Sequence, residues 1–283
     1  MNVFNRVSFY TDRVKRAYKY AKENQILVDP VDTPLGFKFL GHKEMEQGVF
    51  EPDETKLVTT LLQNADVFIN IGANIGYYSC ISIANNVHTI IFEPIQSNLN
   101  FLYKNIYANN FRGTYEIFPV ALSNKTGLIE MYGSGTGASL IRGWDNTPDY
   151  YVSFVPVSTV DTILGKRFEQ KQCFVLIDVE GVEKYVLEGA QTLLKAEKKP
   201  VWMLEIATTE HQPAGITINP DLLPTFELFW ESGYEAWTAS SVVRIIEQEE
   251  VERIHGGGEN TFPGNNNFLF IEKGRKDSFL PSS

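Results

Sequence analysis

The chain has 283 residues, of which 43% are hydrophobic and 13% aromatic, and its formal net charge at pH 7 is −10. The apolar content excludes a disordered chain, and the length allows one α/β domain with added arms. The negative charge argues against a nucleic-acid partner, which usually meets a basic stripe. The two cysteines, Cys80 and Cys173, lie in apolar runs and predict buried thiols in a reducing, cytoplasmic location.

The N-terminal part of the chain predicts an arm rather than a membrane anchor. No apolar run reaches the roughly 18 residues that span a bilayer, so no transmembrane segment is expected. Residues 1–25 combine basic side chains with apolar residues near helical spacing, which predicts a helix on the surface. Residues 26–52 mix prolines and glycines with aromatics and predict short strands and turns. We therefore expect residues 1–52 to form an arm packed on the main domain.

After this arm the sequence alternates between predicted helices and strands. Helices are predicted at 53–64, 76–84, 97–109 and 182–195. Buried strands are predicted at 67–71, 89–92, 115–122, 173–178 and 201–206. Continuous apolar strands separated by helices indicate a parallel sheet that is covered on both faces. Late in the chain, Tyr234–Thr238 and Asn267–Ile271 predict a closing pair of strands with a loop between them.

Residues 127–157 interrupt this alternation. Leu128–Tyr132 and Tyr151–Val155 predict a small β-hairpin, and a glycine-rich loop at 133–137 connects them.

The segment Ile71–Gly76 joins the first buried strand to the first helix after it. Glycines at such a position allow a tight turn and a close approach of the backbone to a ligand. In an open parallel sheet, ligands bind outside the carboxyl ends of the strands, where this loop lies. The Gly-x-x-x-Gly spacing differs from the G-x-G-x-x-G of dinucleotide-binding proteins. Alone, the loop fits a ligand site and a simple packing turn equally well.

Glu93 ends the second buried strand and strengthens the ligand interpretation. A carboxylate about 20 residues beyond such a loop can accept hydrogen bonds from both hydroxyls of a ribose. The order strand, glycine loop, helix, strand, carboxylate favours an adenosine-containing ligand over a solvated strand end. The Gly-x-x-x-Gly spacing of the loop disfavours an NAD-dependent oxidoreductase.

These motifs together resemble those of FkbM-type S-adenosylmethionine-dependent methyltransferases. The resemblance covers roughly Glu51–Glu205 well and the final strand loosely. The segments that carry it are Phe68–Ser79, Glu93-Pro94 with the following Asn98, Pro119–Ser123, Ile177–Glu183, Gly189-Ala190 and Leu204-Glu205.

The resemblance implies an α/β fold with a doubly wound, mostly parallel Rossmann-like sheet. About seven strands are expected, with a closing antiparallel strand, the N-terminal arm and the small β-hairpin insertion. A class I methyltransferase domain is expected over 53–275, with the insertion at 127–157 and a C-terminal tail at 276–283.

The resemblance also implies S-adenosylmethionine as the cofactor. Gly72, Asn74 and Gly76 would line its methionine end, Glu93 would bind the ribose, and Ile95 and Ala121 would flank the adenine. The full set of expected cofactor-binding residues is Asn70, Gly72, Ala73, Asn74, Gly76, Tyr77, Tyr78, Glu93, Pro94, Ile95, Asn98, Ala121, Leu122 and Asp178.

Two positions depart from the family pattern. Asn70 stands where the family usually has Asp, so no charge comes from this position toward the methionine ammonium. Leu176 stands where the family tends to have Lys, so any role of that lysine is absent here.

Four side chains are candidates for catalysis. Asp178 and Glu180 come at the end of one buried strand and Glu205 at the end of the next, so all three are expected at the ligand-binding edge. Asp178 and Glu180 are candidates to meet the cofactor ammonium or the acceptor, and Glu205 and His211 are candidate proton acceptors. His211 lies in a loop, where a surface role is favoured over catalysis, although its unperturbed pKa near 6.5 would suit a base. Glu183 is either part of this acidic group or a favourable charge in the first turn of a helix. No metal site is predicted.

The leading hypothesis is O-methylation of a hydroxyl on a sugar, glycan or secondary metabolite. The alternatives are methylation of a nitrogen or a carboxylate, and a non-catalytic S-adenosylmethionine-binding module. The N-terminal arm, the loop at 133–137 and the segment 240–266 are candidate walls of the acceptor pocket. The oligomeric state stays open, with a homodimer among the options.

Overall fold

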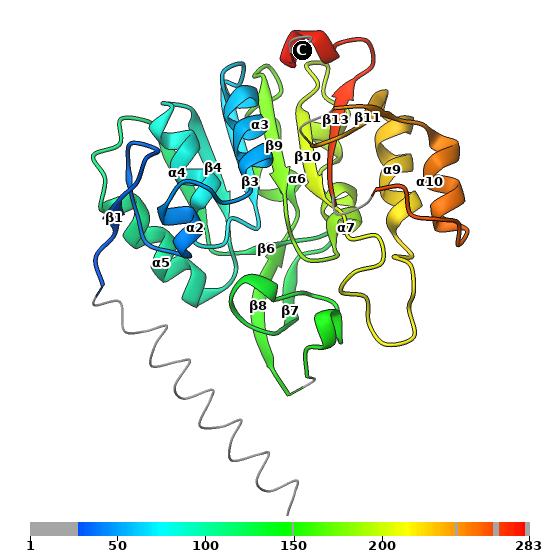
Figure 1. Cartoon of the computed structure of the whole chain (residues 1–283), viewed down its shortest axis with the longest axis horizontal. Helices are drawn as coiled ribbons and strands as arrows, with labels where there is room; N and C mark the ends of the chain where they lie inside the picture. The colour runs from blue at the N-terminus through cyan, green and yellow to red at the C-terminus, as the bar shows by residue number, and fades with distance from the viewer. Residues whose placement is uncertain (1–27, 149, 241–242, 263–265, 281–283) are drawn as a thin grey trace, which may run out of the picture.

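The computed structural model describes residues 28–148, 150–240, 243–262 and 266–280 (Figure 1). The helix predicted over 1–25 lies outside these residues. In the described part of the arm, β1 (Val31–Asp32) pairs antiparallel with β2 (Lys38–Phe39), and the short helix α2 (Lys43–Glu46) follows. The short strands and turns predicted for this segment are therefore present.

Within the described ranges the main sheet has eight strands. Their spatial order is β12 (Ile245–Ile246), β11 (Tyr234–Thr238), β13 (Asn267–Glu272), β10 (Val201–Glu205), β9 (Cys173–Ile177), β3 (Val67–Ile71), β4 (His88–Phe92) and β5 (Tyr115–Phe118). The strands from β5 to β10 are parallel, and β13 is antiparallel to both of its neighbours. The predicted architecture is confirmed. The strand count exceeds the expected seven because the short β12 pairs with β11 at the edge.

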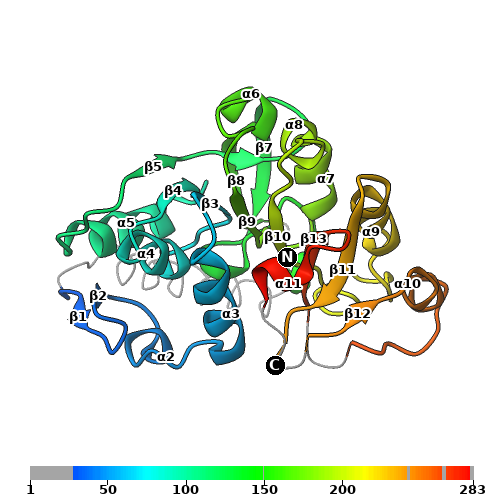
Figure 2. The same ribbon diagram turned by 90° about the horizontal axis from the view of Figure 1, so that it is seen from above.

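Alternating side chains along the strands build one hydrophobic core on each face of the sheet. On β3, Val67, Ile69 and Ile71 join one core, and Phe68 joins the other. Figure 2 shows the two helical layers that cover these faces. One layer contains α3 (Pro52–Leu62), α4 (Tyr77–Ala84), α5 (Gln96–Tyr107) and α11 (Lys276–Phe279). The other contains α6 (Val160–Leu164), α7 (Glu183–Glu188), α8 (Gln191–Leu194), α9 (Leu222–Glu231) and α10 (Gln248–His255).

Several predicted elements differ from the structure. The strand expected over 115–122 ends at Phe118, and the chain resumes after Pro119 as β6 (Ala121–Leu122). The helix expected over 182–195 is split into α7 and α8 at Gly189, where a Cβ would lie 2.2 Å from the carbonyl oxygen of Ser123. The segment predicted as a loop between the closing strands contains α10.

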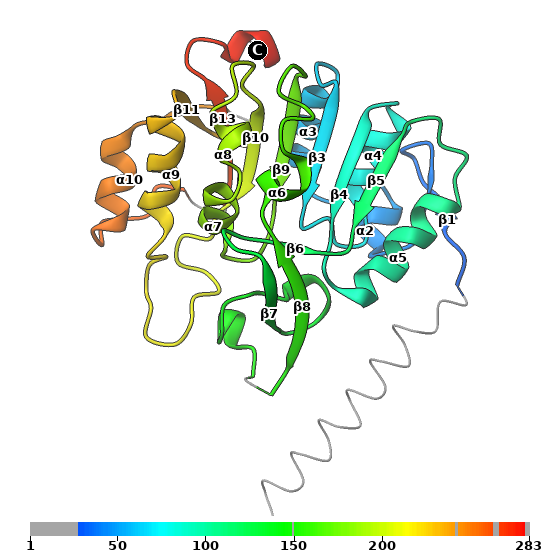
Figure 3. The same ribbon diagram turned by 180° about the vertical axis from the view of Figure 1, so that it is seen from behind.

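The predicted hairpin insertion is present and larger than expected. β7 (Gly127–Tyr132) pairs antiparallel with β8 (Val152–Ser158), and β6 joins β8 in parallel to give a three-stranded sheet. Figures 1 and 3 both show this insertion projecting from the lower edge of the main sheet. The division into arm, domain and tail stays a prediction. In the segment expected as the C-terminal tail, Phe279 and Leu280 are buried in the same core as residues of α3 and α4.

Among the described residues, no helix has both the length and the apolar surface needed to cross a bilayer.

Candidate functional site

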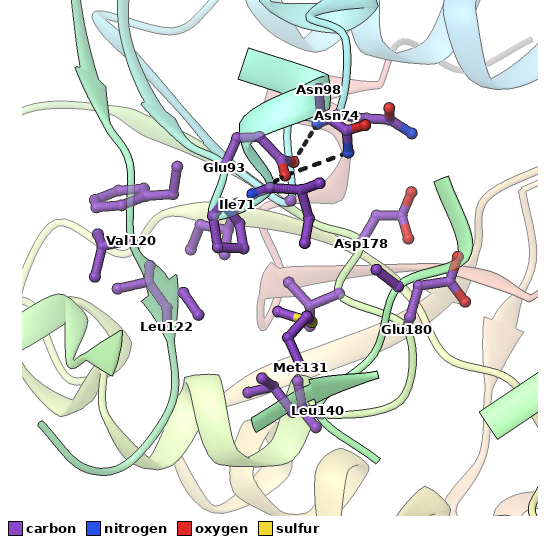
Figure 4. A pocket seen from close by; sticks show the side chains of 18 of the residues that line it. Ile71, Asn74, Glu93, Asn98, Val120, Leu122, Met131, Leu140, Asp178 and Glu180 are labelled. Atoms are coloured by element: carbon purple, nitrogen blue, oxygen red, sulfur yellow. Dashed lines mark hydrogen bonds between the residues drawn. The ribbon is translucent and has the colours of Figure 1, made fainter. Parts of the chain in front are cut away.

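The main pocket lies at the carboxyl edge of β3, β4 and β9, between the sheet and the insertion. It contains about 560 Å³ of empty space. Figure 4 shows Val120 and Leu122 on one side of this pocket and the carboxylates of Asp178 and Glu180 on the other. Its further lining residues are Ile71, Gly72, Asn74, Phe92, Glu93, Pro94, Ile95, Asn98, Ala121, Met131, Gly135, Ala138, Leu140, Val179 and Val182.

Gly72 lets the β3–α4 loop touch the end of β9. Its φ is +83°, and a Cβ on it would lie 1.7 Å from the carbonyl oxygen of Asp178. The N–H of Asp178 in turn donates to the carbonyl of Ile71 at 3.0 Å, which fixes the two strand ends together. Gly76, at the start of α4, also has a positive φ of +91°. Gly76 does not line the main pocket, nor the smaller side pocket described below. It faces Leu102, so we assign it a packing role.

Glu93 is buried in the main pocket and held by three donors. The backbone N–H groups of Asn74 and Ile95 donate to it at 2.8 Å, and Nδ2 of Asn98 donates at 3.3 Å (Figure 4). Burial raises the pKa of Glu93 to about 7, although these hydrogen bonds lower it. A carboxylate has about four acceptor positions. One ribose hydroxyl can therefore bond to Glu93 without displacing a protein donor.

A smaller side pocket adjoins the main pocket through Gly72, Asn74 and Asp178, which line both. It contains about 410 Å³ of empty space. The arm contributes Met45, Phe50 and Glu51 to its wall. Its other lining residues are Asn70, Ala73, Ile75, Tyr77, Tyr78 and Leu176.

The side pocket presents hydrogen-bond acceptors that lack donors. Asn70 is 2% exposed, and its Nδ2 donates to Oγ of Ser79 at 2.9 Å. Its Oδ1 is buried without a partner, as is Oδ1 of Asn74. Buried polar atoms are rarely left unpaired, so these two oxygens fit a ligand that brings N–H donors.

Two carboxylates that the sequence placed at this edge lie beside each other. Leu204 of β10 pairs with Ile177 of β9, so Glu205 follows at the level of Asp178. Burial raises the pKa of Asp178 well above its usual range, and the nearby charge of Glu205 is the second largest cause. Burial raises the pKa of Glu205 to about 7, and the charge of Glu180 is the second largest cause. A carboxyl group with this pKa can exchange a proton near neutral pH.

Glu180 connects this edge to the insertion. Its φ is +56°, and its Oε2 accepts a hydrogen bond from Nε1 of Trp144 at 2.8 Å. Trp144 is 2% exposed, and its ring covers Gly181, where a Cβ would lie 2.5 Å from the ring. Oγ of Ser139 donates to the carbonyl of Glu180. The insertion is thus docked on the loop that follows β9.

His211 lies outside both pockets. Its Nδ1 is 3.0 Å from Oδ1 of Asp145, and this hydrogen bond is the main cause that raises the pKa of His211. Its ring lies 6.0 Å from the ring of Trp144. The structure therefore places Asp178 and Glu180 in the wall of the main pocket, with Glu205, which lines neither pocket, beside Asp178. His211 packs near Trp144 and lies within electrostatic reach of Glu180 and Glu205.

Several lining residues were not predicted from the sequence. Met131, Ala138 and Leu140 come from the insertion and line the main pocket, on either side of the loop at 133–137 that was expected as a wall of the acceptor pocket. Glu51 comes from the arm, directly before α3, and no motif marks it. The described residues of the segment 240–266 line neither pocket.

The site fits the expected cofactor in its chemistry. The main pocket joins apolar walls to a buried carboxylate, as a purine with a ribose requires. The side pocket offers amide oxygens and carboxylates, as an ammonium requires. Within the described ranges, no three histidine, cysteine, aspartate or glutamate side chains are grouped as metal ligands. The prediction of no metal site is not tested by this finding.

Solved methyltransferase structures show limited likeness to the chain. An O-methyltransferase from Bacillus cereus in complex with SAH is 13% identical, with a TM-score of 0.43 over 89% of this chain and 94% of that one. A precorrin-6y C5,15-methyltransferase from Geobacter metallireducens is 14% identical, with a TM-score of 0.37 over 85% and 97%. Among curated proteins, none matches the chain significantly.

The family is established by sequence. The profile described as Methyltransferase FkbM domain matches residues 70–235, which is more than half of the chain. This match spans β3 to the start of β11 and includes the loop of Gly72, Glu93 and the acidic group of Asp178. The chain therefore belongs to the FkbM methyltransferase family, and it is an S-adenosylmethionine-dependent methyltransferase.

Proposed function

We propose that the protein methylates a hydroxyl group of an uncharged acceptor, such as a sugar, a glycan or a secondary metabolite. The observation that carries this proposal is the carboxylate pair Asp178 and Glu205 at the edge of the cofactor site, with the pKa of Glu205 at about 7. A hydroxyl must lose its proton as it becomes methylated. A positioned base contributes about 10²–10⁴-fold to such a step.

The cofactor is proposed to lie across both pockets. Pro94, Ile95, Asn98, Ala121 and Leu122 would surround the adenine end, with Glu93 bonded to the ribose. The methionine end would enter the side pocket, where it meets Asn70, Gly72, Ala73, Asn74, Tyr77 and Tyr78. Asp178 lines both pockets, so the reacting centre would lie near it.

In the proposed reaction, bound S-adenosylmethionine would supply an activated methyl group to the acceptor oxygen, and the electron pair of the broken carbon–sulfur bond would go to sulfur. Glu205 accepts the hydroxyl proton through its carboxylate. Asp178 lies beside Glu205 and favours this protonation. Two adjacent carboxylates repel each other when both are charged, and binding one proton relieves this repulsion. Alignment of acceptor and donor supplies on the order of 7–11 kcal/mol of the barrier reduction.

The charges around the site support an uncharged acceptor over an anionic one. Asp178 lies within electrostatic reach of Glu51, Glu180, Glu183 and Glu205. A carboxylate or phosphate at this edge would be repelled, so methylation of a carboxylate and binding of nucleic acid are both disfavoured. The net charge of −10 agrees with this. Both cysteines are buried free thiols, which supports a cytoplasmic location.

The test is transfer of a labelled methyl group to fractionated cell extract, followed by mild alkali. A methyl ether keeps its label in alkali, and a methyl ester releases it as methanol. The proposal predicts an alkali-stable product whose linkage is to oxygen. An alkali-labile label, or label on nitrogen, would overturn it.

A base variant tests the role of Glu205. Glu205→Gln should lower kcat by about 10²–10⁴-fold while the dissociation constant of S-adenosylhomocysteine stays unchanged. Glu210→Gln is the control, because it removes an exposed carboxylate from the loop that follows β10. In the wild type, kcat/KM should rise as pH passes through about 7, and this rise should vanish in Glu205→Gln. A retained rise would assign the base to another group.

A further inference from the structure

We propose that Glu51, from the arm, supplies the negative charge that recognises the ammonium group at the methionine end of the cofactor. This inference rests on the cofactor orientation of the proposed function. Nothing in the sequence motifs points to Glu51, which lies outside the residues matched by the family profile. Its place in the side pocket brings it to the same cavity as Asn70, Asn74 and Asp178.

The polar atoms of the side pocket define the ligand group that suits it. Oδ1 of Asn70 and Oδ1 of Asn74 are buried acceptors without donors. The carboxyl groups of Glu51 and Asp178 add further acceptors, and a cation between them favours their ionised, negatively charged forms. An ammonium brings three N–H donors for the unpaired oxygens and one positive charge opposite the carboxyl groups. A hydroxyl or an amide would leave the charges uncompensated.

A hydrogen bond from Tyr78 tethers the Glu51 carboxylate at one oxygen. The phenol of Tyr78, in the first turn of α4, donates to Oε2 of Glu51 at 2.6 Å. Within the described residues, Oε1 of Glu51 has no hydrogen-bond partner and is available to a ligand. Glu51 itself has a φ of +40° and is followed by Pro52 at the first position of α3. One oxygen is thus tethered, and the other remains an acceptor.

Among the described residues, no lysine, arginine or histidine lines the side pocket. The charged groups that act on Asp178 are Glu205, Glu180, Glu183 and Glu51, all of them carboxylates. Asn70 offers an amide oxygen but no charge, and it lies on β3 in the wall of the same cavity. The charge needed opposite an ammonium therefore comes from the arm and from β9 instead of from β3. This gives the arm a part in cofactor selection.

The test compares two ligands that differ at the methionine end. S-adenosylhomocysteine has the ammonium, and 5′-deoxy-5′-methylthioadenosine has the adenosine and the thioether without the amino-acid group. Calorimetry on the full chain should show that Glu51→Gln weakens S-adenosylhomocysteine by about tenfold or more, the effect of losing one charge-assisted hydrogen bond. Binding of methylthioadenosine should not change.

Two further variants make the result specific. Glu54→Gln removes a carboxylate from the first turn of α3, outside the side pocket, and should leave the binding of both ligands unchanged. Asn70→Asp, combined with Glu51→Gln, returns a charge to the cavity and should recover most of the lost affinity.

Each outcome separates this proposal from the proposed function. Equal loss of both ligands in Glu51→Gln, no loss of either, or no recovery in the double variant would overturn the role of Glu51 and leave the methyl-transfer proposal standing. A wild-type protein that binds methylthioadenosine as tightly as S-adenosylhomocysteine would show that the side pocket does not hold the methionine end, and both the orientation and the role of Glu51 would fall.

Discussion

At the scale of single residues, the contact between Gly72 and the carbonyl of Asp178 fixes the distance between two strand ends that share the site. We predict that Gly72→Ala weakens S-adenosylhomocysteine binding at least tenfold and lowers stability by more than about 1 kcal/mol. The Cβ would lie 1.7 Å from that oxygen, so the loop or the strand end must move. Urea unfolding and calorimetry measure the two effects.

A variant at a second glycine distinguishes the effect of this clash from the cost of the left-handed backbone conformation. Gly274 has a similar φ of +76°, and a Cβ on it meets nothing within 4 Å. Gly274→Ala should therefore lose only the roughly 1 kcal/mol of the left-handed conformation and keep ligand affinity. Equal losses in the two variants would show that the contact with Asp178 has no special effect.

Glu183 gives a prediction about stability and pH. It is 3% exposed, and Oε1 accepts a hydrogen bond from the N–H of Gly181 at 2.9 Å. Burial raises its pKa from 4.5 to about 8. The folded protein therefore holds this proton where the unfolded chain has lost it, and stability falls as pH rises from about 4.5 to 8. Of the two interpretations of Glu183, the buried acidic group agrees better with this than a solvated helix charge.

Glu183→Gln should remove this loss. At pH 5 the variant and the wild type should have nearly equal free energies of unfolding. At pH 8.5 the variant should be more stable, by at most about 5 kcal/mol, since each pKa unit corresponds to about 1.4 kcal/mol. Glu231→Gln, at an exposed position that ends α9, is the control. A difference between variant and wild type that does not change with pH would contradict the assignment.

At the scale of elements, the sequence predicted what depends on local pattern. The buried strands β3, β4, β9 and β10 read as continuous apolar runs, and the groups that follow them converged at one edge, as parallel strands require. The sequence did not predict that Pro119 divides one strand between two sheets. It also did not predict α10, whose polar residues around Val251 and Ile254 suggested a loop.

The walls of the site were harder to predict than its motifs. Asn98 donates from Nδ2 to the carbonyl of Gly135, and Trp144 donates to Glu180. Both contacts join segments that are more than 30 positions apart, and no local periodicity encodes them. The same holds for Glu51, which reaches the side pocket through the packing of the arm. Motif residues were therefore predictable, and the insertion and arm residues that complete the pockets were not.

The docking of the insertion yields a prediction at this scale. Trp144→Ala removes a buried ring and the donor to Glu180, and such truncations cost about 3–5 kcal/mol. We expect faster dissociation of S-adenosylhomocysteine, because Met131, Ala138 and Leu140 would no longer be held over the main pocket. Stopped-flow dissociation rates and limited proteolysis at the insertion measure these effects.

The control for this variant lies on the same small sheet. Phe154 of β8 is 67% exposed, so Phe154→Ala removes an aromatic ring without removing a buried contact. It should leave dissociation and proteolysis rates unchanged. If Trp144→Ala and Phe154→Ala behaved alike, the insertion would not be held through Trp144.

At the scale of the whole molecule, the site places several acidic groups at one edge of the sheet. The acidic groups of the site with raised pKa values are Glu51, Glu93, Asp178, Glu180, Glu183 and Glu205. For each of them the folded state binds a proton more tightly than the unfolded chain, so deprotonation opposes folding. The ligand-free protein should therefore be less stable at pH 9 than at pH 6. The same deprotonation creates the charge that a cationic cofactor needs.

Binding of the cofactor should reduce this dependence on pH, and the charge of the ligand should decide by how much. S-adenosylmethionine has a sulfonium that S-adenosylhomocysteine lacks, and in the proposed orientation this extra positive charge lies near Asp178 and Glu205. A positive charge there favours the ionised carboxylates and lowers their pKa values toward those of the unfolded chain. Each ligand is used at about 100 times its dissociation constant, where binding adds about 2.7 kcal/mol to the free energy of unfolding. The fall in Tm from pH 6 to pH 9 should then be smaller with S-adenosylmethionine than with S-adenosylhomocysteine. Differential scanning calorimetry measures it, and equal falls with the two ligands would place the sulfonium away from the carboxylate pair.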